Sequence, residues 1–180
     1  MDSGSRILHG ERVDLVHPFP DEELDRVYQW LHAFSSFTEH DDSPANAERY
    51  KFWFQMQWSI VSYALRLPGE GESIGLLYFE PNGARDGYLH IALSRRAWGK
   101  GIADDAAAVC IADTFHRLPE LTRLSASMLE RNRPAQALAR RMGFEQEAIF
   151  RDMVVHSGVP GNAVHFGLTR RDWERHQLSA

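Results

Sequence analysis

One strand–loop–helix segment constrains the fold more than any other part of the sequence. A large aliphatic residue occupies every second position from Gly87 to Ser94, as in a strand with one buried face, and a helical pattern begins at Ile102. Between them, Gly99 and Gly101 let the backbone turn so that successive N–H groups point into one concavity, without a Cβ to keep an anion away. The first N–H groups of the helix add donors and a partial positive charge. The pattern predicts a phosphate-binding loop at Arg96–Ala103; a purely structural glycine turn is the alternative.

Two common phosphate motifs do not fit this loop. A nucleotide P-loop has four residues between its glycines and ends in Lys-Ser or Lys-Thr, whereas only Lys100 separates the glycines here. The dinucleotide fingerprint needs a third glycine where Asp104 stands. The sequence therefore predicts neither a P-loop nucleotide site nor a dinucleotide site.

The remaining periodicity predicts an α/β chain built on one mixed sheet. Strands are predicted at Arg12–His17, Ile60–Leu67, Ser73–Glu80, Gly87–Ser94, Leu121–Leu129, Glu147–Val155 and Ala163–Leu168. Helices are predicted from Leu24 to Phe34, from Ser43 to Trp58, from Ile102 to His116 and from Pro134 to Met142, with a last hairpin turn at Gly158–Gly161. No repeat, low-complexity tract or long linker interrupts the pattern, so we expect residues 1–180 to form a single domain.

The composition limits the classes of binding partner and the cellular compartment that we expect for this chain. The net charge of −5 at pH 7 argues against a nucleic-acid or anionic-membrane surface, which would carry a basic patch, and suits a cationic acceptor better. The single cysteine, Cys110, allows neither an intrachain disulfide nor a cysteine-based zinc site, and no histidine spacing indicates a metal site. Because no signal peptide and no membrane-length apolar run is found, we expect a cytoplasmic protein.

Four landmarks in the sequence resemble those of a known family. The residues Arg96-Ala97-Trp98-Gly99-Lys100-Gly101 fit the Arg/Gln-x-x-Gly-x-Gly/Ala signature of the GCN5-related N-acetyltransferases (GNAT), and the segment Asn132–Phe144 is similar to their helix opened by Asn and ended by Gly-Phe. The opening Leu8–Leu15 and the closing hairpin, with Arg151-Asp152, Gly158 and Leu168, resemble the RimJ/RimL-like branch that acetylates ribosomal-protein N-termini. The resemblance runs from about Leu8 to Trp173.

The resemblance implies a GNAT fold, with a mostly antiparallel central sheet flanked by helices, and acetyl-CoA as co-substrate without a metal. The end of the central strand should offer backbone groups to the pantetheine arm, the loop N–H groups should hold the pyrophosphate, and Asn132 should lie near the thiol. The coenzyme A contacts that it implies are Ala92, Leu93, Ser94, Arg96, Trp98, Gly99, Lys100, Gly101, Ile102, Ala103 and Asn132.

This sequence also departs from the family pattern. Many members carry Ser and Tyr on the helix after the Asn, the Tyr as the acid that protonates the thiolate, but Ala135 and Ala139 stand there. The glutamate common on the central strand of the branch is absent, and its place lies near Tyr88. The usual general acid is therefore missing.

The central strand supplies the candidate catalytic residues. Tyr88 and His90 share one strand face with Ala92, while the aliphatic face packs on helices, so both side chains should point to the cleft. His90 is the predicted general base, acting directly or through a water, because imidazole titrates near neutral pH. A histidine hydrogen-bonded within the sheet is the alternative, and Tyr88 either orients the substrate or only packs.

Acceptor contacts are predicted in three places. The acidic loop with Glu39 and His40 precedes a helix that walls the acceptor cleft in the family; a solvated turn is the alternative. Trp53 on that helix lines an aromatic acceptor pocket or belongs to the core or a homodimer seam, and Ser127 lies on the strand beside the cleft.

The function these features indicate is acetyl-CoA-dependent N-acetyltransfer. The acceptor is a primary amine, on a protein N-terminus or a small molecule, that attacks directly in a ternary complex. A catalytically silent acyl-CoA-binding module and a transferase for a longer acyl chain are the alternatives, based on Ala135 and Ala139.

Overall fold

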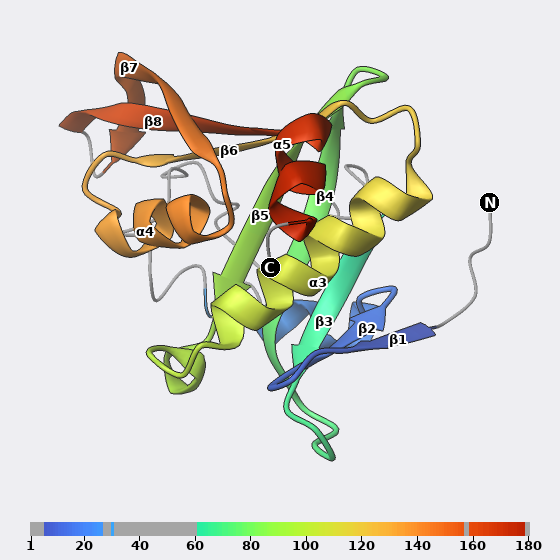
Figure 1. The fold of residues 1–180 in the computed structure, drawn as a ribbon. Coiled ribbons are helices and arrows are strands. Elements are labelled where there is room, and N and C mark those ends of the chain that lie inside the picture. Colours follow the sequence, from blue (N-terminus) through green and yellow to red (C-terminus); the bar gives the residue numbers. More distant parts are fainter. Residues whose placement is uncertain (1–5, 27–29, 31–60, 157–158, 179–180) are drawn as a thin grey trace.

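One mixed sheet organises the part of the chain that the computed structural model describes, which is residues 6–26, 30, 61–156 and 159–178 (Figure 1). Within these residues the sheet has eight strands in the order β1-β2-β3-β4-β5-β6-β8-β7. They are β1 (Arg6–His9), β2 (Asp14–His17), β3 (Val61–Arg66), β4 (Ser73–Asn82), β5 (Asp86–Leu93), β6 (Arg123–Leu129), β7 (Glu145–His156) and β8 (Val159–Thr169). The helices are α3 (Ile102–Arg117), α4 (Arg133–Arg141) and α5 (Arg170–Gln177), with the 3-10 turns η1 (Asp21–Glu23) and η3 (Arg95–Ala97). The predicted mixed sheet flanked by helices is confirmed.

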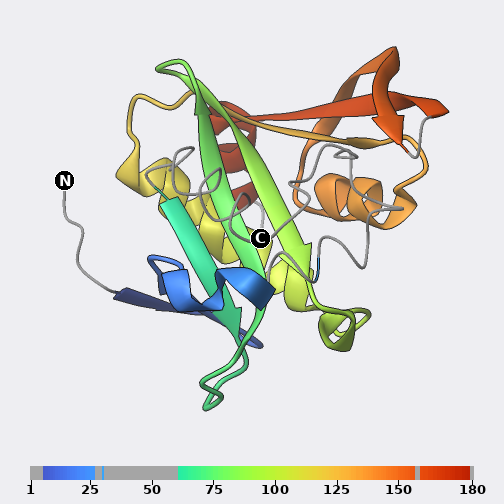
Figure 2. The same ribbon diagram turned by 180° about the vertical axis from the view of Figure 1, so that it is seen from behind.

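Apolar side chains cover both faces of the sheet. The larger cluster joins α3 to the sheet through fully buried residues such as Leu77 and Phe115, and α3 lies across the front of the strands in Figure 1. A smaller cluster, which includes Leu24 and Leu76, covers the opposite face beside η1 (Figure 2). Leu76 and Leu77 serve different clusters because successive strand side chains point to opposite faces. Packing of α3 against the sheet places its first turn at the end of β5.

The sheet divides where β5 meets β6. These two strands run parallel and share a single register pair, Tyr88 with Ser125. By contrast, β4 pairs with β5 along its whole length, from Gly75 opposite Leu93 to Asn82 opposite Asp86. Beyond Tyr88 the two halves splay apart (Figure 1), and no described strand pairs with that edge of β5.

The helix α4 begins and ends one residue earlier than the predicted Pro134–Met142, and the residues expected to flank it do so. The Asn132 side chain accepts a hydrogen bond of 3.2 Å from the Ala135 N–H, and Pro134 stands in the first turn, where a missing N–H costs nothing. Gly143 follows the helix with φ of 85°, the left-handed conformation in which glycine is least strained.

The structure corrects the prediction of a first strand at Arg12–His17. Strand β2 begins only at Asp14, and the unpredicted strand β1 precedes it. The residues between them form a turn closed by a 2.9 Å bond from the Gly10 N–H to the Val13 carbonyl. Arg12 is not in a strand because its N–H donates to the Asp105 carboxylate, far away in the sequence.

The C-terminal region differs from prediction in two ways. The turn predicted at Gly158–Gly161 is wrong, because β8 already begins at Val159, opposite His156. Pro160 is tolerated there because this part of β8 extends beyond β6, whose last pair with β8 joins Leu129 to Ala163. Helix α5 was not predicted, since its residues are mostly polar and lack an apolar period.

Several predicted elements lie outside the described residues. They are the helix at Ser43–Trp58 and most of the helix from Leu24 to Phe34. In the part of the chain that the structure describes, no helix combines the length and the apolar character that a membrane crossing requires.

Candidate active site

The loop after β5 has the backbone geometry predicted for it. Gly99 and Gly101 both take left-handed conformations, with φ of 70° and 74°. A Cβ built on Gly99 would meet no atom within 4 Å, so the space above this residue is open. Gly101 is the N-cap of α3 and provides no side-chain cap to the helix. The loop thus presents an open, uncapped helix N-terminus.

Backbone donors converge on this N-terminus. The first helical hydrogen bond runs from the Asp105 N–H to the Gly101 carbonyl, at 3.1 Å. The N–H groups of Ile102 and Ala103 come before it and have no partner within the helix. Together with the positive end of the helix dipole they form a site suited to an anion.

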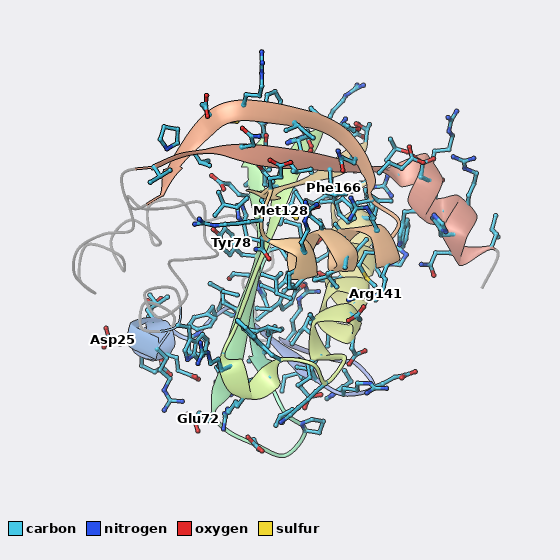
Figure 3. All side chains as sticks on the ribbon, turned by 90° about the vertical axis from the view of Figure 1, so that its left-hand side faces the viewer. Asp25, Glu72, Tyr78, Met128, Arg141 and Phe166 are labelled. Carbon is cyan, nitrogen blue, oxygen red and sulfur yellow. The ribbon has the colours of Figure 1, made fainter. Side chains whose placement is uncertain are left out.

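Two carboxylates in the first turn of α3 would repel an anion if they were not engaged elsewhere. Asp104 binds the guanidinium of Arg141, with Oδ2 3.1 Å from one terminal nitrogen, and Figure 3 shows Arg141 on α4 beside this turn. Asp105 accepts hydrogen bonds from backbone N–H groups of the β1–β2 turn. Both carboxylates are therefore bound by partners of their own, and neither caps the N-terminus of the helix.

The residues that join β5 to the loop show how a ligand would fit. The Trp98 indole N–H donates to the Leu93 carbonyl at 3.1 Å, and Trp98 remains 46% exposed. The hydroxyl oxygen of Ser94 is buried and has no hydrogen-bond partner within the described residues. An unpaired buried hydroxyl is costly, so a polar ligand beside the loop would satisfy it. The open cradle and this hydroxyl fit a phosphate-bearing ligand with further polar groups.

Arg96, the predicted phosphate ligand of the loop, lies beside two carboxylates on the β3–β4 turn. Its guanidinium is 3.8 Å from Glu70 and 3.6 Å from Glu72. Figure 3 places Glu72 at the end of the molecule where the loop lies. All three side chains are about half exposed, and exposed pairs at such distances hold a side chain weakly. Arg96 can therefore exchange these partners for a phosphate.

The open edge of β5 leads directly into the loop. The Ser94 N–H donates to the Ile74 carbonyl of β4 at 2.8 Å, and backbone groups alternate sides along a strand. Ile91 and Leu93 therefore direct their N–H and C=O groups away from β4, toward the side where β6 has diverged. Trp98 takes the Leu93 carbonyl. Among the described residues, the N–H and C=O of Ile91 and the N–H of Leu93 have no strand partner, so an extended ligand with amide groups could pair with them.

His90 is held against its neighbours on the predicted face of β5. Its ring stacks on Tyr78 of β4, with centroids 4.5 Å apart and planes at 9°, and lies 6.3 Å from the Tyr88 ring. Its Nε2 is 2.9 Å from the Glu80 carboxylate, at an angle outside that of a hydrogen bond. An imidazole and a carboxylate therefore lie side by side, and each side chain is about one third exposed.

A second row of rings continues this face across the divergence of the sheet. His165 of β8 meets Tyr88 edge-on at 5.7 Å and Phe150 of β7 at 6.0 Å. Ser127 of β6 pairs in register with His165, which places the predicted acceptor contact in the same row. The face therefore carries aromatic, hydroxyl and carboxylate groups side by side, a combination suited to an amine with an apolar neighbour.

Three residues of this site were not found from the sequence: Tyr78, Glu80 and His165. Asn82-Gly83 does predict a hairpin that brings the strand of Tyr78 and Glu80 beside β5, but a two-residue turn there would place Glu80 opposite Arg85. The observed loop is residues 83–85, and this longer loop shifts the register so that Glu80 pairs with Tyr88. No such local signal exists for His165, whose neighbours in the site come from distant strands.

The other predicted site residues fall into two groups. Glu39, His40 and Trp53 lie outside the described residues. Asn132 stands at the start of α4, where its side-chain oxygen binds the Ala135 N–H. Ala139, in the family's acid position, is 7% exposed within the core.

Comparison with known proteins adds independent observations. Residues 12–145 match the family model described as an acetyltransferase (GNAT) domain. The chain is 33% identical over 183 residues to YdaF of Bacillus subtilis (strain 168), named as a candidate ribosomal N-acetyltransferase, with 94% of this chain and 92% of that protein covered. It is 29% identical over 124 residues to the ribosomal protein uS5-alanine N-acetyltransferase of Escherichia coli (strain K12). That match covers 67% of this chain and only 63% of the length of the relative.

A solved structure shows the same fold. RimL, the ribosomal L7/L12 α-N-protein acetyltransferase in complex with coenzyme A, superposes with a TM-score of 0.76 at 15% sequence identity. The superposition covers 91% of this chain and 98% of that one. At this level of identity the likeness concerns the fold.

Proposed function

Because the chain belongs to the GNAT acetyltransferase family, we propose that it is an N-acetyltransferase that transfers the acetyl group of acetyl-CoA to a primary amine. The observation that carries the proposal is the continuity between the open edge of β5 and the uncapped N-terminus of α3. A ligand that fits both parts has an extended arm with two amides, to pair with the strand edge, and a diphosphate at its end, to bind the helix N-terminus. Coenzyme A has that chemistry.

The residues of the loop and the strand would divide the binding of coenzyme A between them. The N–H groups from Gly99 to Ala103 take the diphosphate, with Arg96 and Lys100 adding positive charge. The Leu93 N–H and the Ile91 C=O pair with the amides of the pantetheine arm as a neighbouring strand would. The thioester then lies beside His90, in the opening between β5 and β6.

The chain offers a proton acceptor and an oxyanion donor for the chemical step. An amine attacks a thioester only when neutral, and His90 takes the proton of the amine, directly or through one water. The Ile91 N–H, the group on the open edge of β5 that is nearer to His90, donates to the oxygen on which negative charge develops. Glu80 beside His90 stabilises the positive charge that the imidazole acquires.

The missing general acid does not prevent this reaction. A thiol has an ordinary pKa of about 8.5, so the leaving thiolate is far more stable near neutral pH than an alkoxide would be. It can depart without a donor and take its proton from water. With alanine at position 139, water protonates the thiolate product in place of a side chain, and acetyl transfer remains possible.

We propose a protein N-terminus as the acceptor. The relatives at 29% and 33% identity are named for acetylation of ribosomal proteins. The face lined by Tyr88, His165 and Glu80 suits the cationic amine of a chain end beside an apolar side chain. The chain's net charge of −5 would also attract basic proteins.

The test has two arms that separate binding from transfer. Calorimetry with coenzyme A should show binding, and its absence would overturn the whole proposal. Thiol release from acetyl-CoA is then followed with a panel that holds Ala- and Ser-starting peptides and small primary amines. Thiol release that depends on a peptide supports the proposal. Release with small amines alone would show that the acceptor is a small molecule and not a protein N-terminus. Tight binding without release for any amine would indicate the silent acyl-CoA-binding module.

A further inference from the structure

The turn between β1 and β2 packs directly against the phosphate loop. This turn, Gly10–Val13, is part of the Leu8–Leu15 opening, for which the proposed function gives no role. Its backbone and one of its side chains contact residues from Lys100 to Asp105. The contacts join the N-terminal hairpin to a loop about 90 residues away in the sequence.

Asp105 makes the backbone half of this junction. Its carboxylate accepts hydrogen bonds from the N–H groups of Glu11, Arg12 and Val13, at 3.1, 2.7 and 3.1 Å. The approach is close enough that a Cβ on Gly10 would lie 2.4 Å from an Asp105 oxygen. A side chain at position 10 would displace the Asp105 carboxylate from these three bonds, which hold the turn on the first turn of α3.

Arg12 makes the side-chain half. Its guanidinium donates to the Lys100 carbonyl at 3.2 Å, and the same nitrogen would be 3.2 Å from a Cβ on Gly101. The Lys100–Gly101 peptide is planar and trans, so its C=O and N–H point in opposite directions. A donor that holds the Lys100 carbonyl on one side turns the Gly101 N–H toward the other side.

We propose that Arg12 is a positioning residue of the coenzyme A site, which fixes the Lys100–Gly101 peptide with its N–H directed into the diphosphate cradle. The inference rests on the proposed function, because it concerns the same site. Arg12 acts on the ligand through the peptide and touches no phosphate. Two left-handed glycines separated by one residue make the loop easy to deform, so an external constraint of this kind lowers the cost of ordering it on binding.

The experiment compares coenzyme A binding by calorimetry in the full chain and three variants. Arg12→Met keeps the aliphatic stem against Gly101 and removes the donors, whereas Arg12→Lys keeps the charge with different geometry. Arg175→Met is the matched control, because it removes an arginine from an exposed ion pair on α5. Hydrogen exchange of the 98–103 amides is measured without ligand, together with thermal unfolding.

We expect Arg12→Met to weaken coenzyme A binding by about five- to tenfold, the size of one lost hydrogen bond. Exchange at residues 98–103 should become faster while the midpoint of unfolding stays within about 2 °C, as for other exposed contacts. The lysine variant should bind as weakly as the methionine variant, and the slope of log Kd against log salt should not change. The control should match the wild type in every measurement.

Several outcomes would overturn the inference. Wild-type affinity in Arg12→Met would show that the peptide needs no external support. Full recovery in Arg12→Lys, with a shallower salt slope in Arg12→Met, would mean that the side chain contacts phosphate directly. If the wild type itself binds no coenzyme A, the proposed function fails first; if it binds and Arg12→Met binds equally well, only this inference fails.

Discussion

Glu80 Oε2 lies 2.9 Å from His90 Nε2, across the hairpin of β4 and β5. The two residues belong to adjacent register pairs on one face of the sheet, where Tyr78 pairs with His90 and Glu80 with Tyr88. The stacked Tyr78 ring fixes the plane of the imidazole, and the carboxylate faces one of its nitrogens. An imidazole in this setting can accept a proton and hold the resulting charge, which is what the proposed transfer requires of it.

His90→Asn should lower kcat for acetyl transfer by about 100-fold, the lower range for removal of a general base. Affinity for coenzyme A should be unchanged, because its binding contacts are on the loop and the open edge. The rate of the variant should rise with pH as the acceptor amine loses its own proton. Glu80→Gln should lower kcat by only about fivefold, as expected for the loss of one partly exposed charge pair. Steady-state kinetics from pH 6 to 9 measure both, and an unchanged kcat in His90→Asn would remove this residue from the mechanism.

Gly99→Ala should weaken coenzyme A binding by about tenfold, because the added methyl group occupies the open cradle and opposes a φ of 70°. The backbone strain alone should lower the free energy of unfolding by about 1 kcal/mol. Gly83→Ala is the matched control, since Gly83 also has positive φ, 77°, and open space, but lies on the β4–β5 turn. Urea unfolding should report the same loss of stability in both. If calorimetry gives the wild type and Gly99→Ala equal affinities for coenzyme A, the assignment of this loop as the diphosphate site is wrong.

Replacing Glu70 and Glu72 together by glutamine should tighten coenzyme A binding. The two carboxylates lie 3.8 and 3.6 Å from the Arg96 guanidinium and compete with a phosphate for it. Because the pairs are exposed, the expected gain is about threefold in Kd at low salt, and it should disappear as salt screens the charges. A control with Glu120 and Glu174 both changed to glutamine makes the same change in net charge beside Arg85, at the other end of β5 from the loop. If both double variants gain equally, overall charge explains the effect and Arg96 has no special part.

The loop could be predicted from the sequence because its signals are local. Gly99 and Gly101 stand between a period of two and a period of 3.6, and each of these features is readable within a dozen residues. The same holds for α4, where Asn132 and Gly143 mark the two ends. Helix α5 shows where local signals are not enough. Thr169 caps it by accepting a hydrogen bond from the Asp172 N–H, but the helix could not be predicted because its polar residues have no apolar period.

The parts of the site that were not predicted depend on contacts between distant residues. Asp105 reads as an ordinary first-turn acid of a helix, and nothing near it in the sequence indicates that it binds the turn at Glu11. Arg96 reads as a phosphate ligand, and its pairs with Glu70 and Glu72 follow only from the position of the β3–β4 turn. These partners are set by how α3 packs on the sheet, which periodicity does not determine.

A partly buried charge cluster between α3 and the strands β1 and β3 leads to a prediction about stability at low pH. Asp113 accepts hydrogen bonds from Arg6, one of them at 2.6 Å, and from the Tyr63 hydroxyl. Burial opposes ionisation of Asp113, but these bonds outweigh it and hold the pKa of the carboxyl below its ordinary 3.8. Burial, followed by the bond to Asp113, raises the pKa of Tyr63, so the phenol stays protonated as the donor.

Asp113→Asn should therefore lower the free energy of unfolding at pH 7 by about 2 kcal/mol, since it removes charge-assisted bonds from a partly exposed cluster. A carboxyl with a depressed folded-state pKa stabilises the fold fully above its unfolded pKa and loses that effect as pH falls through the folded value. The difference between wild type and variant should thus be constant from pH 7 to about 5 and shrink below 3.8. Urea unfolding at pH 7, 5, 4 and 3 measures it in a His17→Gln background, because burial lowers the pKa of His17 and the Asp113 charge also acts on it. A difference that stays constant down to pH 3 would show that the Asp113 charge does not stabilise the fold.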